Sequence, residues 1–144
     1  MKQAFTLLEL IITIVIVGVL ATLGFTQYTI TVEKARTAEA IAQIGFMRKL
    51  AYEYYFKYGS LDGIQNSDVE VDYTCRTTNF YSYLVYSPNP LWCNLAAYRC
   101  TGGGKAPNAS RGYIYYLQYY PGSGQETWHC YYTDDNSTCF GLPW

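Results

Sequence analysis

Few side chains in this sequence are of the types that perform acid–base or metal chemistry. His129 is the only histidine, which is too little for His-based catalysis or a His-rich metal site. The sequence contains no phosphate-binding P-loop, no G-x-S-x-G nucleophile motif and no H-E-x-x-H zinc motif. We therefore expect no catalytic residues, no cofactor and no enzymatic activity.

Two neighbouring acids and five cysteines are further groups that could bind a metal ion or form disulfides. Asp134 and Asp135 could bind calcium, but a solvated turn is the favoured interpretation, and we expect no metal site. The cysteines all lie in the second half of the chain, at Cys75, Cys93, Cys100, Cys130 and Cys139. No C-x-x-C pair occurs, so zinc ribbons, redox motifs and c-type haem are not indicated. Disulfides are the default in a small exported domain.

One carboxylate directly precedes a long apolar stretch. No residue from Leu10 to Val32 is charged, and these 23 residues would extend about 35 Å as a helix. That length is enough to cross the hydrocarbon core of a bilayer, which is about 30 Å thick. A carboxylate such as Glu9 is costly at this place unless it is paired or lies at the interface. Glu9 is therefore a candidate functional residue.

The residues around Glu9 resemble a known processing motif. The run Ala4-Phe5-Thr6-Leu7-Leu8-Glu9-Leu10, followed by the apolar stretch, resembles the motif of type IV pilins and type II secretion pseudopilins. The resemblance implies that a prepilin peptidase cuts between Ala4 and Phe5, that the new amine of Phe5 is methylated, and that Glu9 directs assembly. Ala4 stands where the family almost always has glycine, and Thr26 stands where many members have proline.

The resemblance and the distribution of charge divide the chain into four parts. We expect a leader at residues 1–4, an apolar transmembrane or filament-core helix at 5–32, an amphipathic continuation of that helix at 33–58, and a head at 59–144. The expected fold class is α+β, with a long helical spine and a small antiparallel β-sheet, as in pilins. No proline precedes Pro88, and Gly59 is placed to end the helix as a C-cap.

Apolar residues recur at steps of three and four in the second part of the expected helix. This pattern predicts one apolar stripe that packs on the head. Its members are Ala38, Ile41, Ile44, Met47, Ala51, Tyr54, Tyr55 and Tyr58. Phe46 and Leu50 lie outside the stripe, and we expect them to contact the helices of neighbouring subunits.

The head has the pattern of short strands and turns. Alternation predicts a strand at 69–73, and β-prone residues predict strands at 80–86, 112–120 and 126–132, the last two joined by a hairpin turn at 121–125. Sixteen of the seventeen tyrosines follow residue 51. Because tyrosine combines an apolar ring with a polar tip, we expect most of them to form the core of a thin sheet on a helix.

The cysteine pairing is partly implied by the resemblance. Cys130 and Cys139 resemble the cysteine pair that closes the last loop of many type IV pilins. The other three cysteines then leave one bridge and one odd thiol. A Cys75–Cys93 bridge would tie a loop to the sheet, whereas Cys93–Cys100 would close a small local loop. The sequence does not choose between them.

The composition and the resemblance together favour a structural role. Ten basic and eleven acidic residues nearly cancel, so the chain is not a strongly basic nucleic-acid binder. The resemblance implies a subunit of a type IV pilus, held in the inner membrane before assembly and on the cell surface afterwards. Its partners would be identical subunits, the inner membrane, the prepilin peptidase and the assembly machinery. The alternatives are a type II secretion pseudopilin and a minor or tip pilin.

Overall fold

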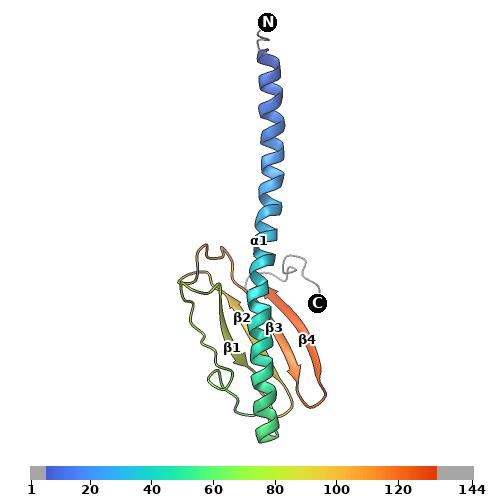
Figure 1. Ribbon diagram of the computed structural model, residues 1–144, viewed down its shortest axis with the longest axis vertical. Helices are drawn as coiled ribbons and strands as arrows, with labels where there is room; N and C mark the ends of the chain where they lie inside the picture. Colours follow the sequence, from blue (N-terminus) through green and yellow to red (C-terminus); the bar gives the residue numbers. More distant parts are fainter. Residues whose placement is uncertain (1–5, 133–144) are drawn as a thin grey trace. The chain divides into compact units, whose positions relative to one another are not determined.

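The computed structural model describes residues 6–132, which form one long helix and one β-sheet. Helix α1 covers Leu7–Tyr58 and is 52 residues long. It is followed by β1 (Tyr81–Tyr86), β2 (Cys93–Arg99), β3 (Tyr113–Tyr120) and β4 (Gln125–Tyr132), as Figure 1 shows. The α+β class is confirmed: a long N-terminal helix precedes a small antiparallel sheet in a pilin-like arrangement.

Both ends of α1 follow from residues that satisfy its backbone. Thr6 precedes the first helical residue and exchanges hydrogen bonds with Glu9 one turn later. At the other end, Gly59 adopts a φ of 72°, and its N–H donates to the carbonyl of Tyr55 at 2.7 Å. Glycine reaches this left-handed conformation without steric cost, so the C-cap that the sequence predicts at Gly59 is present.

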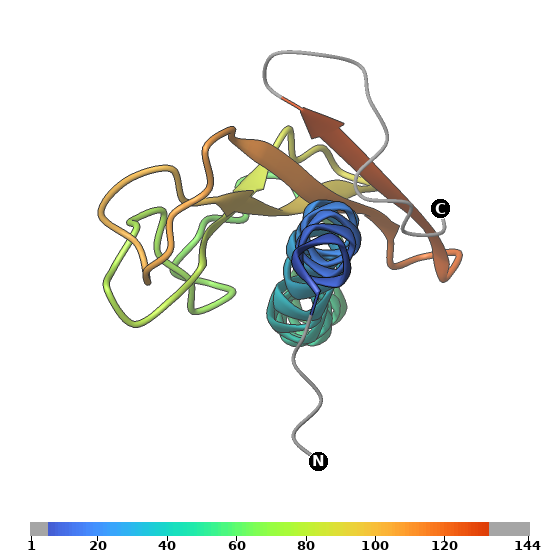
Figure 2. The same cartoon turned by 90° about the horizontal axis from the view of Figure 1, so that it is seen from above.

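The chain is divided into two compact units, Met1–Ala35 and Arg36–Trp144. In the first unit, the described residues from Leu7 onward are helical, and the large apolar side chains from Leu7 to Tyr28 are exposed. In the second unit, residues 36–58 of α1 lie on one face of the four-stranded sheet (Figure 2).

The sheet is a meander in which sequential strands are neighbours. The order is β1-β2-β3-β4, and each pair is antiparallel. One row of partners across all four strands is Tyr83, Ala97, Tyr115 and Cys130. Since side chains alternate between the two faces of a strand, every second residue faces α1, and the residues between them form the outer face.

A core forms where α1 covers the inner face of the sheet. Ile44 and Met47 of α1 are fully buried among sheet residues such as Leu95 and Leu117. Tyrosine rings complete this core, and the hydroxyls of Tyr81 and Tyr113 are 2.7 Å apart. The buried members of the cluster that come from the strands are Tyr81, Tyr83, Cys93, Leu95, Ala97, Tyr113, Tyr115, Leu117 and Tyr119.

The predicted stripe of α1 is confirmed in its middle and differs at its ends. The predicted Ile44, Met47 and Ala51 are fully buried, and Tyr54 and Tyr55 pack partly against the core. At the start of the stripe, Thr37 and Ala40 are buried in place of the predicted Ala38 and Ile41, which are exposed, and at its end Tyr58 is exposed. Positions 37, 40, 44, 47 and 51 follow one three-and-four spacing along the helix. Of the two residues assigned to neighbouring subunits, Phe46 is 42% exposed, but Leu50 packs partly against the core.

Residues 69–73 do not form the predicted strand. Turn hydrogen bonds join Glu70 N to Ser67 O at 3.4 Å and Val71 N to Asn66 O at 3.0 Å, and Glu70 has a φ of 53°. This segment instead covers the free edge of β1. The amide of Tyr83 donates to Asp72 O at 3.1 Å, and the amide of Val85 donates to Asn66 Oδ1 at 2.8 Å.

Strand β2 was not predicted from the sequence. Its centre is Leu95-Ala96-Ala97, in which buried side chains point to both faces and leave no alternation of polar and apolar residues. A strand whose side chains are buried on both faces need not alternate polar and apolar residues, so the periodic pattern that marks a half-exposed strand is lost.

Candidate functional site at the start of the helix

Thr6 and Glu9 form a reciprocal hydrogen-bonded pair in the first turn of α1. Glu9 Oε2 accepts from Thr6 N at 3.0 Å and from Thr6 Oγ1 at 2.7 Å, and Glu9 N donates to Thr6 Oγ1 at 3.3 Å. This is the capping-box arrangement, in which a residue before the helix and an acid three positions later satisfy each other's polar groups. The carboxylate is also near the positive end of the helix dipole.

Glu9 was predicted from the sequence as a functional residue, but Thr6 was not. The signal was present, because threonine followed three residues later by glutamate is the sequence pattern of a capping box. Ala4 and Phe5, the residues of the expected cleavage site, lie outside the described residues, so cleavage and methylation stay predictions.

The helix after Glu9 has the length and composition of a membrane span. Within residues 6–132, α1 is the one helix that is both long enough and apolar enough to cross a membrane. Its most apolar stretch of 18 residues has a mean hydropathy of 2.5 and contains no buried residue. Two threonine hydroxyls in this stretch are satisfied within the helix. Thr13 Oγ1 donates to Leu10 O and Thr22 Oγ1 donates to Val19 O, each at 2.8 Å. These threonines can therefore lie in an apolar medium at little cost.

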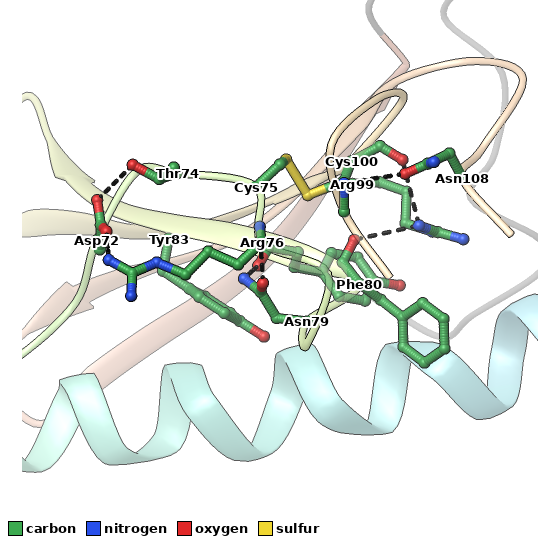
Figure 3. The surroundings of a disulfide bond; sticks show 12 residues. Asp72, Thr74, Cys75, Arg76, Asn79, Phe80, Tyr83, Arg99, Cys100 and Asn108 are labelled. Carbon is green, nitrogen blue, oxygen red and sulfur yellow. Dashed lines mark hydrogen bonds and ion pairs between the residues drawn. A yellow bond between two sulfur atoms is a disulfide. The ribbon is translucent and has the colours of Figure 1, made fainter. Parts of the chain in front are cut away.

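The structure pairs Cys75 with Cys100, a bridge that differs from both pairings considered for these cysteines (Figure 3). Cys93 is a free thiol in the core, and its burial raises its pKa to about 12. Cys93 faces α1 from the first position of β2, whereas Cys100 follows the last residue of the same strand. The length of β2 thus separates these two cysteines and excludes a Cys93–Cys100 bridge.

Cys130 is part of a disulfide. Its predicted partner Cys139 lies outside the described residues, so this pairing stays a prediction. The acidic pair Asp134 and Asp135 also lies outside them. Among residues 6–132, no three histidine, cysteine, aspartate or glutamate side chains gather in a way that could hold a metal ion.

His129 has an environment of aromatic rings. It lies on the outer face of the sheet, and its ring stacks on that of Tyr116 with centroids 4.8 Å apart and planes 20° apart. No carboxylate or nucleophile is hydrogen-bonded to it within the described part of the chain. The geometry therefore shows a half-buried histidine that packs on an aromatic ring.

Comparison with known proteins matches the first part of the chain to one family model. Residues 1–25 match the prokaryotic N-terminal methylation motif. The match includes the expected cleavage site, Thr6, Glu9 and the uncharged stretch as far as Phe25. Searches of curated proteins and of solved structures found no match. The chain thus begins with a prokaryotic N-terminal methylation motif, which is characteristic of type IV pilins and pseudopilins.

Proposed function

We propose that this chain is a structural subunit of a type IV pilus. It enters the inner membrane as a prepilin and polymerises through its N-terminal helix. The observation that carries the proposal is the methylation motif at residues 1–25, in which Glu9 is held at the start of a long, uncharged and exposed helix. Such a helix suits a membrane first and a filament core afterwards, because both surround it with apolar groups.

Processing would precede assembly. A prepilin peptidase would cut between Ala4 and Phe5, remove the leader at residues 1–4, and leave a methylated amine on Phe5. This amine would stand one residue before Thr6, close to the carboxylate that Thr6 now holds. The processed chain would then leave the inner membrane through the assembly machinery and reach the cell surface as part of a filament.

Glu9 would act by pairing with an amine. Its partner would be the Phe5 amine of its own chain or that of a neighbouring subunit, and the second pairing would set the axial register between helices. Two unit charges about 4 Å apart attract by about 4 kcal/mol at an effective dielectric near 20, before desolvation. A misregistered subunit would leave the charge of Glu9 without a cation in apolar surroundings, and this cost would disfavour its incorporation.

The second unit adds apolar surface that a filament could bury. Within residues 36–58 of α1, several large apolar side chains remain exposed. They are Ile41, Phe46, Tyr52, Phe56 and Tyr58. Lateral contacts between helices of identical subunits would cover such side chains, whereas isolated exposed ones are ordinary on any surface.

The experiment that tests the proposal examines filaments sheared from the cell surface. Electron microscopy should show filaments, and mass spectrometry should identify this chain as their main component. Deletion of the gene should remove the filaments. Filaments that keep another protein as their main component, together with loss of protein secretion, would instead identify a pseudopilin. Filaments that become rare but unchanged in main component would identify a minor pilin.

A further inference from the structure

A cleft of about 470 Å³ lies at one end of the sheet in the second unit. It is bounded by the segment around Tyr73, by Ser82 and Tyr98 of the first two strands, and by the loop that connects β2 to β3. Its volume is within the range of small-ligand sites, which runs from about 300 to 1,000 Å³. The cleft belongs to a part of the chain that the proposed assembly role does not use.

The walls of the cleft are held in place by covalent and hydrogen bonds. The Cys75–Cys100 disulfide joins two of them (Figure 3). The β2–β3 loop is tied back by Ala109 N, which donates to Cys100 O at 3.0 Å, and by Gly104 N, which donates to Asn108 Oδ1 at 3.2 Å. A Cβ added at Gly104 would lie 2.5 Å from that of Cys100, so the loop approaches the bridge as closely as glycine allows. A fixed cleft binds with less loss of conformational entropy than a mobile loop.

Two tyrosine rings provide an apolar surface in the cleft. Tyr73 and Tyr98 pack edge to face, with centroids 5.1 Å apart and planes 84° apart. Tyr73 is 54% exposed, so its ring remains accessible to a ligand. Aromatic rings of this kind accept the C–H face of a sugar, while the hydroxyls at the rim of the sugar are left for hydrogen bonds.

Polar groups line the rest of the cleft, and their charge is positive. Ser82 is only 4% exposed, and it contributes a hydroxyl to the lining of the cleft. Ser110 and Thr101 add two further hydroxyls. Arg111 is exposed and forms no ion pair with a described residue, and no acidic side chain lines the cleft. Hydroxyls in the wall of a cleft and an exposed guanidinium without an ion pair among the described residues are groups to which a ligand can bind.

We propose that this cleft binds an acidic saccharide. The sugar ring lies against Tyr73 and Tyr98, its hydroxyls bond to Ser82 and Ser110, and its carboxylate pairs with Arg111. Arginine suits this role because its planar guanidinium can bind both carboxylate oxygens at once. The absence of acidic groups from the lining argues against a metal ion or an amine as the ligand.

The outer face of the sheet favours a saccharide of several units. Tyr98 lies in the same cross-strand row as Ile114 and Tyr131. The ring of Tyr131 stacks on that of Tyr116, with centroids 5.7 Å apart and planes 18° apart. Tyr116 also carries the stacked ring of His129. Aromatic rings therefore continue from the cleft across β2, β3 and β4, where further sugar units would pack.

Binding of trigalacturonic acid and of its methyl ester to the full-length chain in detergent micelles tests the proposal. The two probes have the same ring shape, but the ester lacks the negative charge. By isothermal titration calorimetry, we expect the acid to bind about tenfold tighter than the ester. Arg111→Gln should lower the affinity for the acid to that for the ester. Lys57→Gln, which removes an exposed cation from the last turn of α1, should change neither affinity.

A second pair of variants separates binding from folding. Tyr73→Ala should weaken the binding of both probes at least tenfold. Because the ring of Tyr73 is partly exposed, its removal should have little effect on the core. Ser82→Ala should weaken the binding of both probes by a smaller factor than Tyr73→Ala does. Near-ultraviolet circular dichroism should show unchanged packing in both variants. The ring of Tyr73 should affect the binding of both probes, whereas Arg111 should affect only the binding of the acid. If Tyr73→Ala and Arg111→Gln weaken the binding of both probes equally, these separate roles are contradicted.

Two results would overturn the proposal. One is an intact chain that binds neither probe, or binds the acid and the ester equally. The other is an Arg111→Gln variant that binds as the wild type does but assembles no filaments, which would make the cleft a contact between copies of the chain. The binding measurement uses unassembled protein, so its failure would leave the proposed filament role untouched.

Discussion

Thr6 and Glu9 satisfy each other's polar groups across the first turn of α1, and three hydrogen bonds of 2.7–3.3 Å join them. The carboxylate at the start of the apolar helix therefore has a partner within its own chain. A newly formed amine at Phe5 would compete with Thr6 for the same oxygen. The hydrogen bonds from Thr6 thus satisfy the Glu9 carboxylate before cleavage creates the Phe5 amine with which it would pair in the proposed mechanism.

We predict that Glu9→Val leaves membrane insertion and leader cleavage intact but abolishes filaments. The apolar stretch from Leu10 to Val32 supplies insertion by itself, whereas pairing with an amine requires the carboxylate. Membrane fractionation, intact mass and electron microscopy measure the three properties. Thr6→Val should reduce filaments less than Glu9→Val, and Thr6→Ser should match the wild type because serine keeps the hydroxyl. Normal filaments in Glu9→Val, with cleavage confirmed, would remove the mechanism.

The mature protein is expected to begin at Phe5. Its intact mass should lack Met1–Ala4 and should include one additional methyl group, because the matched motif is a methylation motif. Mass spectrometry of purified filament protein measures both changes at once. A Phe5→Ser variant tests whether the prepilin peptidase requires the aromatic residue after the cleavage site. Assembled filaments whose subunits retain the leader would contradict this prediction.

Ile44→Ala should destabilise the second unit by about 2–5 kcal/mol, whereas Ile41→Ala should cost less than about 1 kcal/mol. The two isoleucines are one turn apart on α1, but Ile44 is fully buried and Ile41 is 40% exposed. Denaturant unfolding followed by near-ultraviolet circular dichroism gives both values. Equal costs would show that the buried face of the helix is not the one described.

Peptide mapping without reduction should find Cys75 joined to Cys100 and Cys130 joined to Cys139. The Cys75–Cys100 bridge spans a sequence separation of 25 residues. A loop of that length corresponds to about 3.5 kcal/mol of stabilisation in the chain-entropy model. The double variant Cys75→Ser/Cys100→Ser should therefore unfold at a lower denaturant concentration. A bridge between Cys75 and Cys93 would show that β2 is misplaced.

The free energy of unfolding should fall as the pH rises above about 9, partly because of Cys93. Burial raises the pKa of this thiol from 9.0 to about 12. Between these values the unfolded chain has lost the thiol proton while the folded chain retains it, so rising pH favours unfolding. The slope contributed by one such group is at most about 1.4 kcal/mol per pH unit. Below pH 9 the thiol is protonated in both the folded and the unfolded chain, so its contribution to the free energy of unfolding is complete there.

Cys93→Ala isolates that contribution, because the tyrosines titrate in both proteins. The difference in unfolding free energy between the wild type and the variant should shrink between pH 9 and 11. Iodoacetamide should label Cys93 of the wild type only in denaturant. Rapid labelling of the native protein at pH 8 would contradict the burial of this thiol.

The parts of the fold that could be predicted depend on local sequence. The uncharged run, the lack of proline and the glycine at position 59 together define α1, and the turn around Gly122 marks the β3–β4 hairpin. Other features depend on residues that meet only after folding. The Cys75–Cys100 bridge requires the end of β2 to lie beside the segment that covers β1, and no spacing in the sequence reports this.

The candidate sites show the same distinction. Glu9 was found because a charge next to an apolar run is visible in the sequence, and Thr6 could have been found from the capping-box spacing. The cleft could not, because Tyr73, Ser82 and Arg111 come from three separate segments. Neither Ser82 nor Arg111 belongs to a motif, and only the register of the first two strands brings Ser82 beside Tyr98.

The segment that covers β1 also limits how copies of this chain can associate. An uncovered edge strand presents free amides to which another chain can add a strand, and such growth leads to amyloid-like aggregates. The outward amides of Tyr83 and Val85 are already bonded to Asp72 and Asn66. Copies of the chain crowded together, as in the proposed filament, would therefore be protected from β-aggregation at this edge, because no free amide is left at these two positions for another chain to pair with.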